Sequence, residues 1–271
     1  MLKVNKLSHS FGKKEVLHDV SLELPDGIYG LLGPNGSGKT TLMRCITGVL
    51  HPTKGSVEVP DKLGYLPQRF GVFRELTAYE ALAYFATLKE IPKDQQRDAV
   101  MASLEYVHLA DRANDKIKAL SGGMVRRMGI AQALLGNPKL VLVDEPTAGL
   151  DPEERLRFKN MISQLRKGRT ILISTHIVED VESLCDHIII MQSGNILCQD
   201  TAEGIRGLAE GMVYSVPSAD KDALASPYTL LRDEYIGGEQ RLRVLSSVPQ
   251  PGTLITPTVE DGYMSRIRKV L

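Results

Sequence analysis

The sequence Gly33-Pro34-Asn35-Gly36-Ser37-Gly38-Lys39-Thr40-Thr41 directly follows the apolar run Gly27–Leu32. It matches the pattern G-x-x-x-x-G-K-[ST], which joins a strand to a helix in its usual context. The apolar run predicts that strand, and residues 39–48 are expected to form the helix. Glycines let the backbone curl so that N–H groups converge on phosphate oxygens at the positive end of the helix dipole. The stretch therefore predicts an α/β fold with a phosphate site, and a glycine-rich turn without a ligand is the alternative.

A second apolar run, Leu140-Val141-Leu142-Val143, ends in Asp144-Glu145. It is too short for a typical helix and predicts a buried parallel strand. A carboxylate at the end of such a strand, beside a phosphate loop, can hold Mg²⁺ through its water shell, and Asp144 is the candidate. Lys39 is expected to reach the β- and γ-phosphates and Thr40 the Mg²⁺, while Glu145 is placed to polarise the attacking water. Carboxylates that merely cap a strand end are the alternative.

The chain also carries an ordered series of short motifs around these two runs. They are Phe11, Tyr65-Leu66-Pro67-Gln68, Leu120-Ser121-Gly122-Gly123-Met124, Ala148-Gly149-Leu150-Asp151 and Ser174-Thr175-His176. With the phosphate loop and the acidic strand end, the series closely resembles the nucleotide-binding subunits of ABC ATPases, from about residue 2 to residue 208. The resemblance implies ATP hydrolysis, with ATP and Mg²⁺ as cofactors. It implies nucleotide contacts by Gly33, Pro34, Asn35, Gly36, Ser37, Gly38, Lys39, Thr40, Thr41, Ser121, Gly122 and Gly123.

Three side chains outside the phosphate loop take roles from this resemblance. Phe11 resembles the aromatic residue that stacks on adenine. Gln68 resembles the switch glutamine that touches Mg²⁺ and the attacking water when the site closes, and His176 resembles the histidine that hydrogen-bonds the γ-phosphate. A core phenylalanine, a surface amide and a structural histidine are the respective alternatives. The implied catalytic set is Lys39, Gln68, Glu145 and His176.

The insert Ser121-Gly122-Gly123 is the most informative motif, because its chemistry makes sense only between two molecules. A hydroxyl, two glycine N–H groups and a helix predicted over residues 124–135 form a second anion-binding helix terminus, with Arg126 and Arg127 near its start. The phosphate loop already cradles the chain's own nucleotide, so the insert predicts a second ATPase subunit, packed head to tail around a shared ATP. A glycine cap before a new helix is the alternative. Met124 stands where many family members carry glutamine, and this variant resembles exporter-type bacterial systems.

Composition and charge limit the possible partners and location. The 271-residue chain has 33 Lys and Arg against 33 Asp and Glu, so its formal net charge is zero and no nucleic-acid partner is expected. Three widely spaced cysteines without metal-ligand spacing indicate a reducing cytoplasm. No signal peptide is visible in residues 1–10, and no apolar run approaches the ~20 residues needed to span a bilayer. The expected location is cytoplasmic, on the inner face of the cell membrane, where a partner supplies the membrane connection.

The organisation of the chain divides into two parts. Residues 1–207 are predicted to form the ABC ATPase domain, with a mostly parallel sheet in the P-loop core. An antiparallel β subdomain is expected over residues 2–24 and a helical insertion over about 77–135. Ser193-Gly194-Asn195 predicts a tight hairpin between two further strands.

From about residue 204 the pattern changes, and residues 212–216 and 240–245 are expected to form short strands, with prolines between the elements. Residues 208–271 are therefore predicted to form a small C-terminal α+β appendage. Its segment Pro257-Thr258-Val259-Glu260-Asp261 resembles the ending of many family members that serve two-component export systems. Dimer contact, regulation and protection of the sheet edge are all open as its role.

The sequence thus predicts an ATP-hydrolysing ABC transporter subunit that dimerises around two ATP molecules and drives a separate integral membrane permease, with export favoured. Residues 69–84 are expected to receive a short helix of the permease, with Phe70, Val72 and Phe73 as an apolar lining. Packing of these side chains in the core is the alternative.

Two rival functions come from other classes. A soluble ABC ATPase that acts on ribosomes or nucleic acid is disfavoured because ribosome-acting relatives usually carry two such domains in one chain. The DNA-repair relatives insert a long coiled coil between the phosphate loop and the acidic strand, which this chain lacks. A non-catalytic nucleotide binder is disfavoured by the presence of Glu145 in a complete set of motifs.

Overall fold

The computed structural model describes residues 1–71 and 73–268, and its core is a six-stranded sheet with the order β5-β6-β7-β3-β8-β9. The strands are β3 (Gly27–Leu32), β5 (Leu63–Leu66), β6 (Leu140–Asp144), β7 (Thr170–Thr175), β8 (His187–Gln192) and β9 (Asn195–Asp200). The first five are parallel, and β9 pairs antiparallel with β8. β6 and β7 are buried along their whole length, as a sheet covered on both faces requires. The predicted P-loop core with a mostly parallel sheet is confirmed.

The register of three central strands decides where the loops meet. Leu32 at the end of β3 pairs with Thr175 of β7, and Asp144 at the end of β6 pairs with Ser174. The carboxyl ends of β3, β6 and β7 therefore lie together at one edge of the sheet. The loops that follow them carry the phosphate-loop, Asp144-Glu145 and His176 motifs.

A smaller antiparallel sheet lies beside the core. Its order is β2-β1-β4, formed by β1 (Leu2–Phe11), β2 (Lys14–Leu24) and β4 (Lys54–Glu58). Together with α1 (Lys39–Ile46) and the central sheet, it encloses a cluster in which Leu7, Leu42 and Leu142 are fully buried. The antiparallel pair expected over residues 2–24 is present, and β4 adds a third strand.

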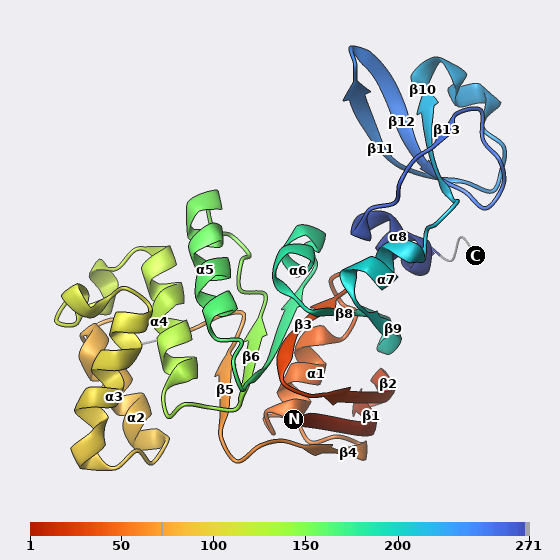
Figure 1. The fold of residues 1–271 in the computed structure, drawn as a ribbon. Coiled ribbons are helices and arrows are strands. Elements are labelled where there is room, and N and C mark those ends of the chain that lie inside the picture. The colour runs from red at the N-terminus through yellow and green to blue at the C-terminus, as the bar shows by residue number, and fades with distance from the viewer. Residues whose placement is uncertain (72, 269–271) are drawn as a thin grey trace.

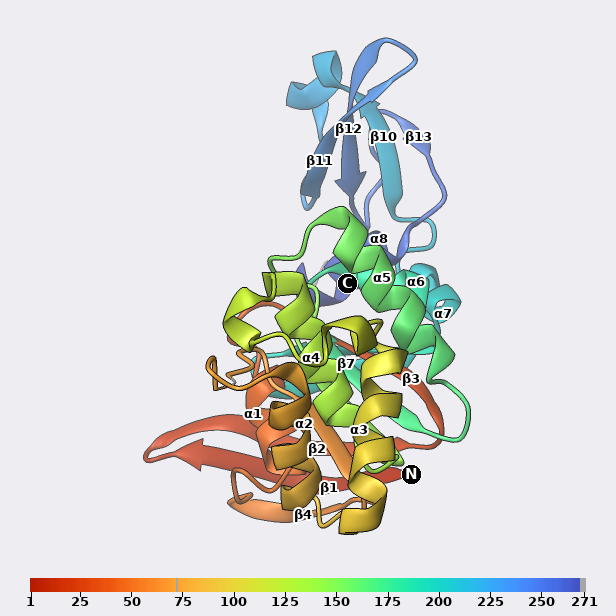
Figure 2. The ribbon, with the colours of Figure 1, turned by 90° about the vertical axis from the view of Figure 1, so that its left-hand side faces the viewer.

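The segment expected to be helical contains α2 (Ala78–Leu88), α3 (Lys93–Tyr106) and α4 (Gly122–Leu134). α2 begins with a capping box, because Thr77 and Glu80 each accept the other's backbone N–H at 3.1 and 2.8 Å. Buried residues of all three helices share one apolar cluster with Val141 and Ile171 of the sheet. Figures 1 and 2 show the three helices grouped at one side of the molecule.

Three further helices and one hairpin complete the core. α5 (Pro152–Gln164) and α6 (Val178–Leu184) precede and follow β7, and α7 (Ala202–Gly207) follows β9. Between β8 and β9, Ser193 and Gly194 both adopt positive φ, at 46° and 79°. Positive φ at both central residues defines the tight hairpin turn that the sequence predicted.

The C-terminal residues form a third sheet with the order β11-β12-β10-β13. Its strands are β10 (Val213–Pro217), β11 (Thr229–Ile236), β12 (Glu239–Leu245) and β13 (Thr253–Leu254). In both ribbon views this sheet and the N-terminal sheet lie at opposite ends of the molecule. The final helix, α8 (Val259–Arg268), returns to the core, where Val259 and Tyr263 share an apolar cluster with Ile188 and Ile205.

A buried ion pair joins the C-terminal sheet to α8. Arg243 of β12 donates to both carboxylate oxygens of Asp261, at 2.9 and 2.6 Å, and the Asp261 residue is 1% exposed. The same carboxylate accepts the N–H and hydroxyl of Thr258, at 2.6 and 2.8 Å. The segment 257–261 singled out in the sequence therefore anchors the C-terminal sheet to the helix that packs on the core.

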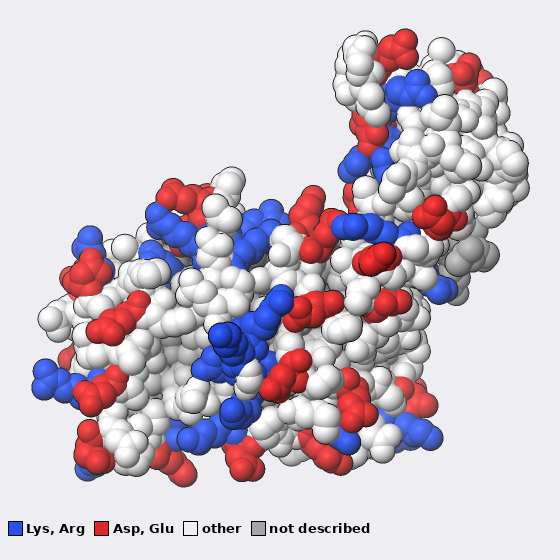
Figure 3. Space-filling model, viewed as in Figure 1, with Lys and Arg blue, Asp and Glu red and all other residues white. Residues whose placement is uncertain are grey.

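On the face drawn in Figure 3, Lys and Arg gather in a band across the middle of the molecule, and Asp and Glu lie mostly to either side of it. Among the helices of residues 1–71 and 73–268, none combines the length and the apolar character needed to cross a bilayer.

Candidate nucleotide-hydrolysis site

The phosphate loop is held in shape by its glycines and by Lys39. Gly36 and Gly38 have φ of 79° and 109°, a region that side chains with a Cβ avoid. A Cβ on Gly33 would lie 2.2 Å from the carbonyl oxygen of Met191. The Lys39 ammonium donates to the carbonyl oxygens of Gly33 at 2.7 Å and Pro34 at 3.2 Å. The Lys39 side chain therefore lies against the backbone of the phosphate loop and stabilises its curvature.

The amino end of α1 suits an anion. Its N-cap is Gly38, and no side chain among the described residues caps the helix there. The first N–H groups of a helix lack intrahelical partners and carry the positive end of its dipole. The Ser37 hydroxyl is buried in the same loop and has no hydrogen-bond partner within the described chain. These donors are what a phosphate group requires.

Asp144 lies at the end of β6 and is completely buried. Its Oδ1 accepts hydrogen bonds from the Thr40 hydroxyl at 3.3 Å and from the Ser174 hydroxyl. Its Oδ2 is buried without a hydrogen-bond partner among the residues described. A buried carboxylate oxygen that lacks a partner is costly unless a ligand occupies it.

These groups fit a magnesium site. Mg²⁺ prefers oxygen ligands and is usually bound by one or two protein groups together with water and substrate phosphates. The buried carboxylate of Asp144 and the hydroxyl of Thr40 supply such oxygens beside the phosphate loop.

Glu145 contacts two other predicted site residues, Lys39 and His176. Its carboxylate lies 3.4 Å from the Lys39 ammonium through Oε1 and 2.9 Å from Nδ1 of His176 through Oε2. The Lys39 and Glu145 side chains are 5% and 7% exposed, whereas the His176 side chain is 45% exposed. Glu145 thus connects the phosphate loop to the residue that follows β7.

The backbone of Glu145 is unusual, because its φ is 46°. Positive φ is uncommon for residues other than glycine and clusters at functional sites, where surrounding contacts maintain it. The Glu145 N–H donates to the carbonyl and the hydroxyl of Ser174, at 3.0 and 3.1 Å. Ser174 had no predicted role, although its position at the end of a strand predicted beside the acidic one could have indicated this contact.

The insert Ser121-Gly122-Gly123 lies at the start of α4, where Ser121 and Gly122 are exposed. The Ser121 hydroxyl accepts the N–H of Met124 at 3.2 Å, and a hydroxyl that accepts one bond can still donate another. Among the described residues, no hydrogen bond or ion pair joins this insert to the phosphate loop of the same chain. The insert is therefore open to a ligand held by another molecule.

The two arginines of α4 do not extend this anion site as the sequence suggested. Arg127 donates to the carbonyl oxygens of Val107 and His108, at 3.1 and 3.2 Å, and lies 3.5 Å from the Glu154 carboxylate. Arg126 also points inward, and all of its nitrogens donate to backbone carbonyl oxygens. Burial lowers the pKa of the Arg126 guanidinium, and the carboxylates of Asp144 and Glu145 oppose this shift.

Two predicted site residues lie apart from the cluster around Glu145. The Gln68 side chain is exposed and makes no hydrogen bond to the residues described, although its backbone carbonyl accepts from Arg126 at 2.9 Å. Phe11 is 51% exposed, with its ring edge-on to His9 at a centroid distance of 4.7 Å. An exposed aromatic face suits stacking on a base, and this role stays a prediction.

The fold and site define a P-loop ATPase with a phosphate loop, a buried carboxylate and a glutamate held beside them. The family model described as ABC transporter matches residues 17–148. The chain is 36% identical to the uncharacterised ABC transporter ATP-binding protein YdbJ of Bacillus subtilis, over 82% of this chain and 76% of that protein. The chain belongs to the ABC transporter ATP-binding proteins and is an ATPase of that family.

A second relative and a solved structure support the same assignment. Nod factor export ATP-binding protein I of Rhizobium johnstonii is 35% identical, with 71% of this chain and 67% of that protein covered. A dimeric ATP-binding cassette in a post-hydrolysis state, bound to ADP and phosphate, superposes with a TM-score of 0.65 at 26% identity. That match covers 74% of this chain and 98% of the other chain.

Proposed function

We propose that this ATPase works as a homodimer that closes around two ATP molecules and moves a separate membrane permease, and that the complex is an exporter. The observation that carries the proposal is the insert Ser121-Gly122-Gly123, in which Ser121 and Gly122 are exposed. Among the described residues, no hydrogen bond or ion pair joins it to the phosphate loop of the same chain. A dimeric arrangement of a similar cassette supports closure between two copies. The name of one relative, a Nod factor export protein, supports export.

In the proposed mechanism, each of the two sites takes its phosphate loop and catalytic side chains from one chain and the insert Ser121-Gly122-Gly123 from the other. The phosphate loop binds the nucleotide, and Lys39 compensates charge on the transferred phosphoryl group. Glu145 accepts a proton from the attacking water, and His176 hydrogen-bonds the γ-phosphate. Asp144 and Thr40 hold Mg²⁺, which when bound neutralises charge on the phosphate oxygens.

The contacts of Glu145 matter for this mechanism. Its carboxylate pairs with Lys39 and His176, the two groups expected to contact phosphate. An incoming triphosphate competes for both partners because it is also an anion. Glu145 is then freed to interact with water at the moment when the phosphates are in place.

An exposed aromatic patch is the proposed contact for the permease. Phe73 is 65% exposed and meets the ring of Tyr84 edge-on at 6.0 Å, and Leu88 is 60% exposed on the same helix. Phe70 is partly buried and packs toward Phe85, so it supports the patch from within. Val72, the third residue predicted for this lining, lies outside the described residues. Grouped exposed apolar residues favour a partner.

The first test is a Glu145→Gln variant. Gln keeps the shape of the side chain but cannot accept a proton, so turnover is expected to fall at least about 100-fold while ATP still binds. An ATP-dependent dimer should accumulate, measured by size-exclusion chromatography with light scattering. Turnover near that of the unaltered protein would remove Glu145 from this role.

Partner identity separates transport from the soluble alternatives. Tagged full-length chain is purified from the membrane fraction in mild detergent, and its partners are identified by mass spectrometry. A stoichiometric polytopic membrane protein is expected, and its loss in a Phe73→Ser, Tyr84→Ser variant would place the contact on the exposed patch. Reproducible recovery of ribosomal or DNA-associated proteins instead would refute the transport proposal.

A further inference from the structure

Arg126 of α4 makes an uncommon set of contacts. Among the described residues, its guanidinium donates five hydrogen bonds to five backbone carbonyl oxygens and none to a carboxylate. The acceptors and donor–acceptor distances are Pro67 at 3.1 Å, Gln68 at 2.9 Å, Asp144 at 3.0 Å, Glu145 at 2.8 Å and Pro146 at 3.1 Å. A guanidinium has five N–H groups in a rigid planar fork, so this number of bonds uses its full capacity.

Three of these carbonyls bracket the proposed general base. The oxygens of Asp144 and Glu145 belong to the peptide groups before and after the Glu145 Cα, and the Pro146 oxygen lies one residue further on. Those peptide groups determine the backbone conformation of Glu145, whose φ of 46° is unfavourable for a residue with a Cβ. A rigid donor that fixes both of them can maintain this conformation and thereby aim the carboxylate at Lys39 and His176.

The other two acceptors belong to a different part of the chain. Pro67 and Gln68 follow β5 and lead into the residues that carry the exposed patch of Phe73 and Tyr84. The Arg126 side chain therefore bonds α4, the helix that begins at the insert Ser121-Gly122-Gly123, to both the loop after β5 and the loop after β6. A shift of either loop relative to α4 must stretch or break the bonds that it accepts from Arg126.

We propose that Arg126 is a positioning residue that holds Glu145 in its working conformation and couples that conformation to the loop containing Gln68. This inference rests on the proposed role of Glu145. When Arg126 holds all three segments, Glu145 is aimed for hydrolysis. When the loop after β5 moves, as docking of a partner on the neighbouring patch would require, the alignment of Glu145 changes with it.

The test replaces Arg126 by Met, which keeps most of the aliphatic stem but donates no hydrogen bond. Small misplacements of a catalytic group can reduce rate by roughly 100-fold, so kcat for ATP hydrolysis by the full-length chain should fall about 10- to 100-fold. The KM for ATP should stay within about threefold, because Arg126 does not contact the phosphate loop in the described chain. The variant should also accumulate an ATP-dependent dimer, as a slowed but binding-competent enzyme does. Arg126→Lys should give a smaller loss of kcat, because it restores charge and some donors without the planar fork.

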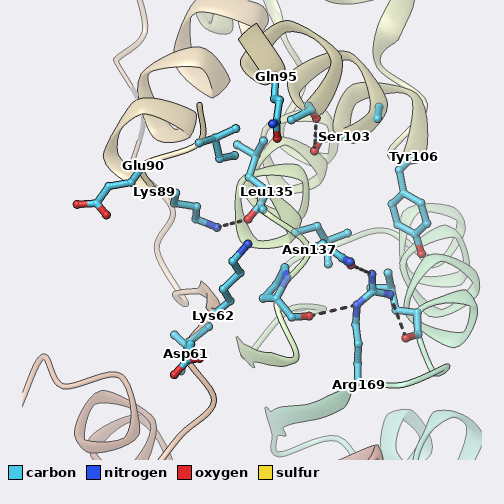
Figure 4. Close-up of a pocket in the computed structure, with 18 of the residues that line it drawn as sticks. Asp61, Lys62, Lys89, Glu90, Gln95, Ser103, Tyr106, Leu135, Asn137 and Arg169 are labelled. Carbon is cyan, nitrogen blue, oxygen red and sulfur yellow. Dashed lines mark hydrogen bonds between the residues drawn. The ribbon is translucent and has the colours of Figure 1, made fainter. Parts of the chain in front are cut away.

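Arg169 provides a matched control at the opposite edge of the sheet. Like Arg126 it is partly buried and donates to backbone carbonyls, those of Pro138 at 3.2 Å and Leu165 at 3.4 Å, and also to the Asn137 side chain. It lines a cavity of about 800 Å³ together with Asn137 and Tyr106, and the three side chains are labelled in Figure 4. Arg169→Met removes a comparable set of contacts away from Glu145. It should lower the melting temperature while leaving kcat within about twofold.

Three results would overturn the inference. They are an unchanged kcat in Arg126→Met, whether or not KM rises, an equal loss of kcat in Arg169→Met, and a loss of kcat without the ATP-dependent dimer. If Arg126→Met does not fold, the same comparisons are made with Arg126→Lys. Glu145→Gln is measured in parallel: full activity there defeats the proposed function itself, whereas an inactive Glu145→Gln beside a fully active Arg126 variant defeats only this inference.

Discussion

The ion pair between Lys39 and Glu145 predicts that Glu145→Gln binds ADP more tightly than the unaltered protein does. The two side chains are almost completely buried and lie 3.4 Å apart, so their gross attraction at an effective dielectric constant of about 20 is ~5 kcal/mol. A nucleotide phosphate must compete with this attraction. Lys39 keeps its bonds to the carbonyls of Gly33 and Pro34, and water solvates the released carboxylate, which together offset most of the cost. A net gain of about 1–2 kcal/mol on removing the charge corresponds to roughly 5- to 30-fold tighter binding.

The assay is isothermal titration of the full-length chain with ADP in the absence of Mg²⁺. ADP lacks the γ-phosphate, so the measurement avoids the ATP-dependent dimer expected of Glu145→Gln. Glu153→Gln is the control, because it removes one negative charge from an exposed glutamate that pairs with Arg157 on α5. Its ADP affinity should match that of the unaltered protein. Equal or weaker ADP binding by Glu145→Gln would show that the pair does not compete with phosphate.

Two further predictions concern the attachment of the C-terminal sheet. Burial raises the pKa of Asp261, but hydrogen bonds from Arg243 and Thr258 outweigh this and hold it below its ordinary value. The carboxylate therefore stabilises the fold above its unfolded pKa near 4 and loses this effect as pH falls through the folded pKa. Asp261→Asn should lower the free energy of unfolding by about 3 kcal/mol at pH 7. The difference in melting temperature between the variant and the unaltered protein should narrow below pH 4, and a difference that stays constant with pH would contradict this prediction. Gly262→Ala places a Cβ 1.7 Å from the carbonyl oxygen of Ile205, so thermal melts should show a loss of at least ~1 kcal/mol, and unchanged melting would refute the contact.

Much of the core could be read from local patterns. Short continuous runs of apolar residues located the buried strands, because a strand covered on both faces, such as β6 or β7, is buried along its whole length. The hairpin at Ser193 and Gly194 was predictable because few residues tolerate positive φ. β11 was missed, since its mixture of exposed and half-buried residues has no clear alternation. The packing of α8 on the core was also missed, because it depends on Val259 and Tyr263 meeting Ile188 and Ile205, which lie far earlier in the chain.

For the candidate site, the sequence predicted the positions of the residues but not their contacts. The motifs placed Lys39, Asp144, Glu145 and His176 at strand ends, and parallel strands bring such ends to one edge. They did not reveal that Glu145 pairs with Lys39 and His176, or that Arg126 turns toward backbone carbonyls rather than toward an anion.

The sequence by itself determined the phosphate loop, the buried parallel strands and the membership in the ABC family, because these depend on residues close together in the chain. Backbone curvature at glycines and burial of apolar runs are local requirements that a short motif satisfies. Only the tertiary structure decided the partners of Arg126, which lie up to 59 residues away, and the contacts of Glu145 with Lys39 and His176. A donor with several possible acceptors is directed by the packing of whole segments, and sequence spacing does not specify that packing.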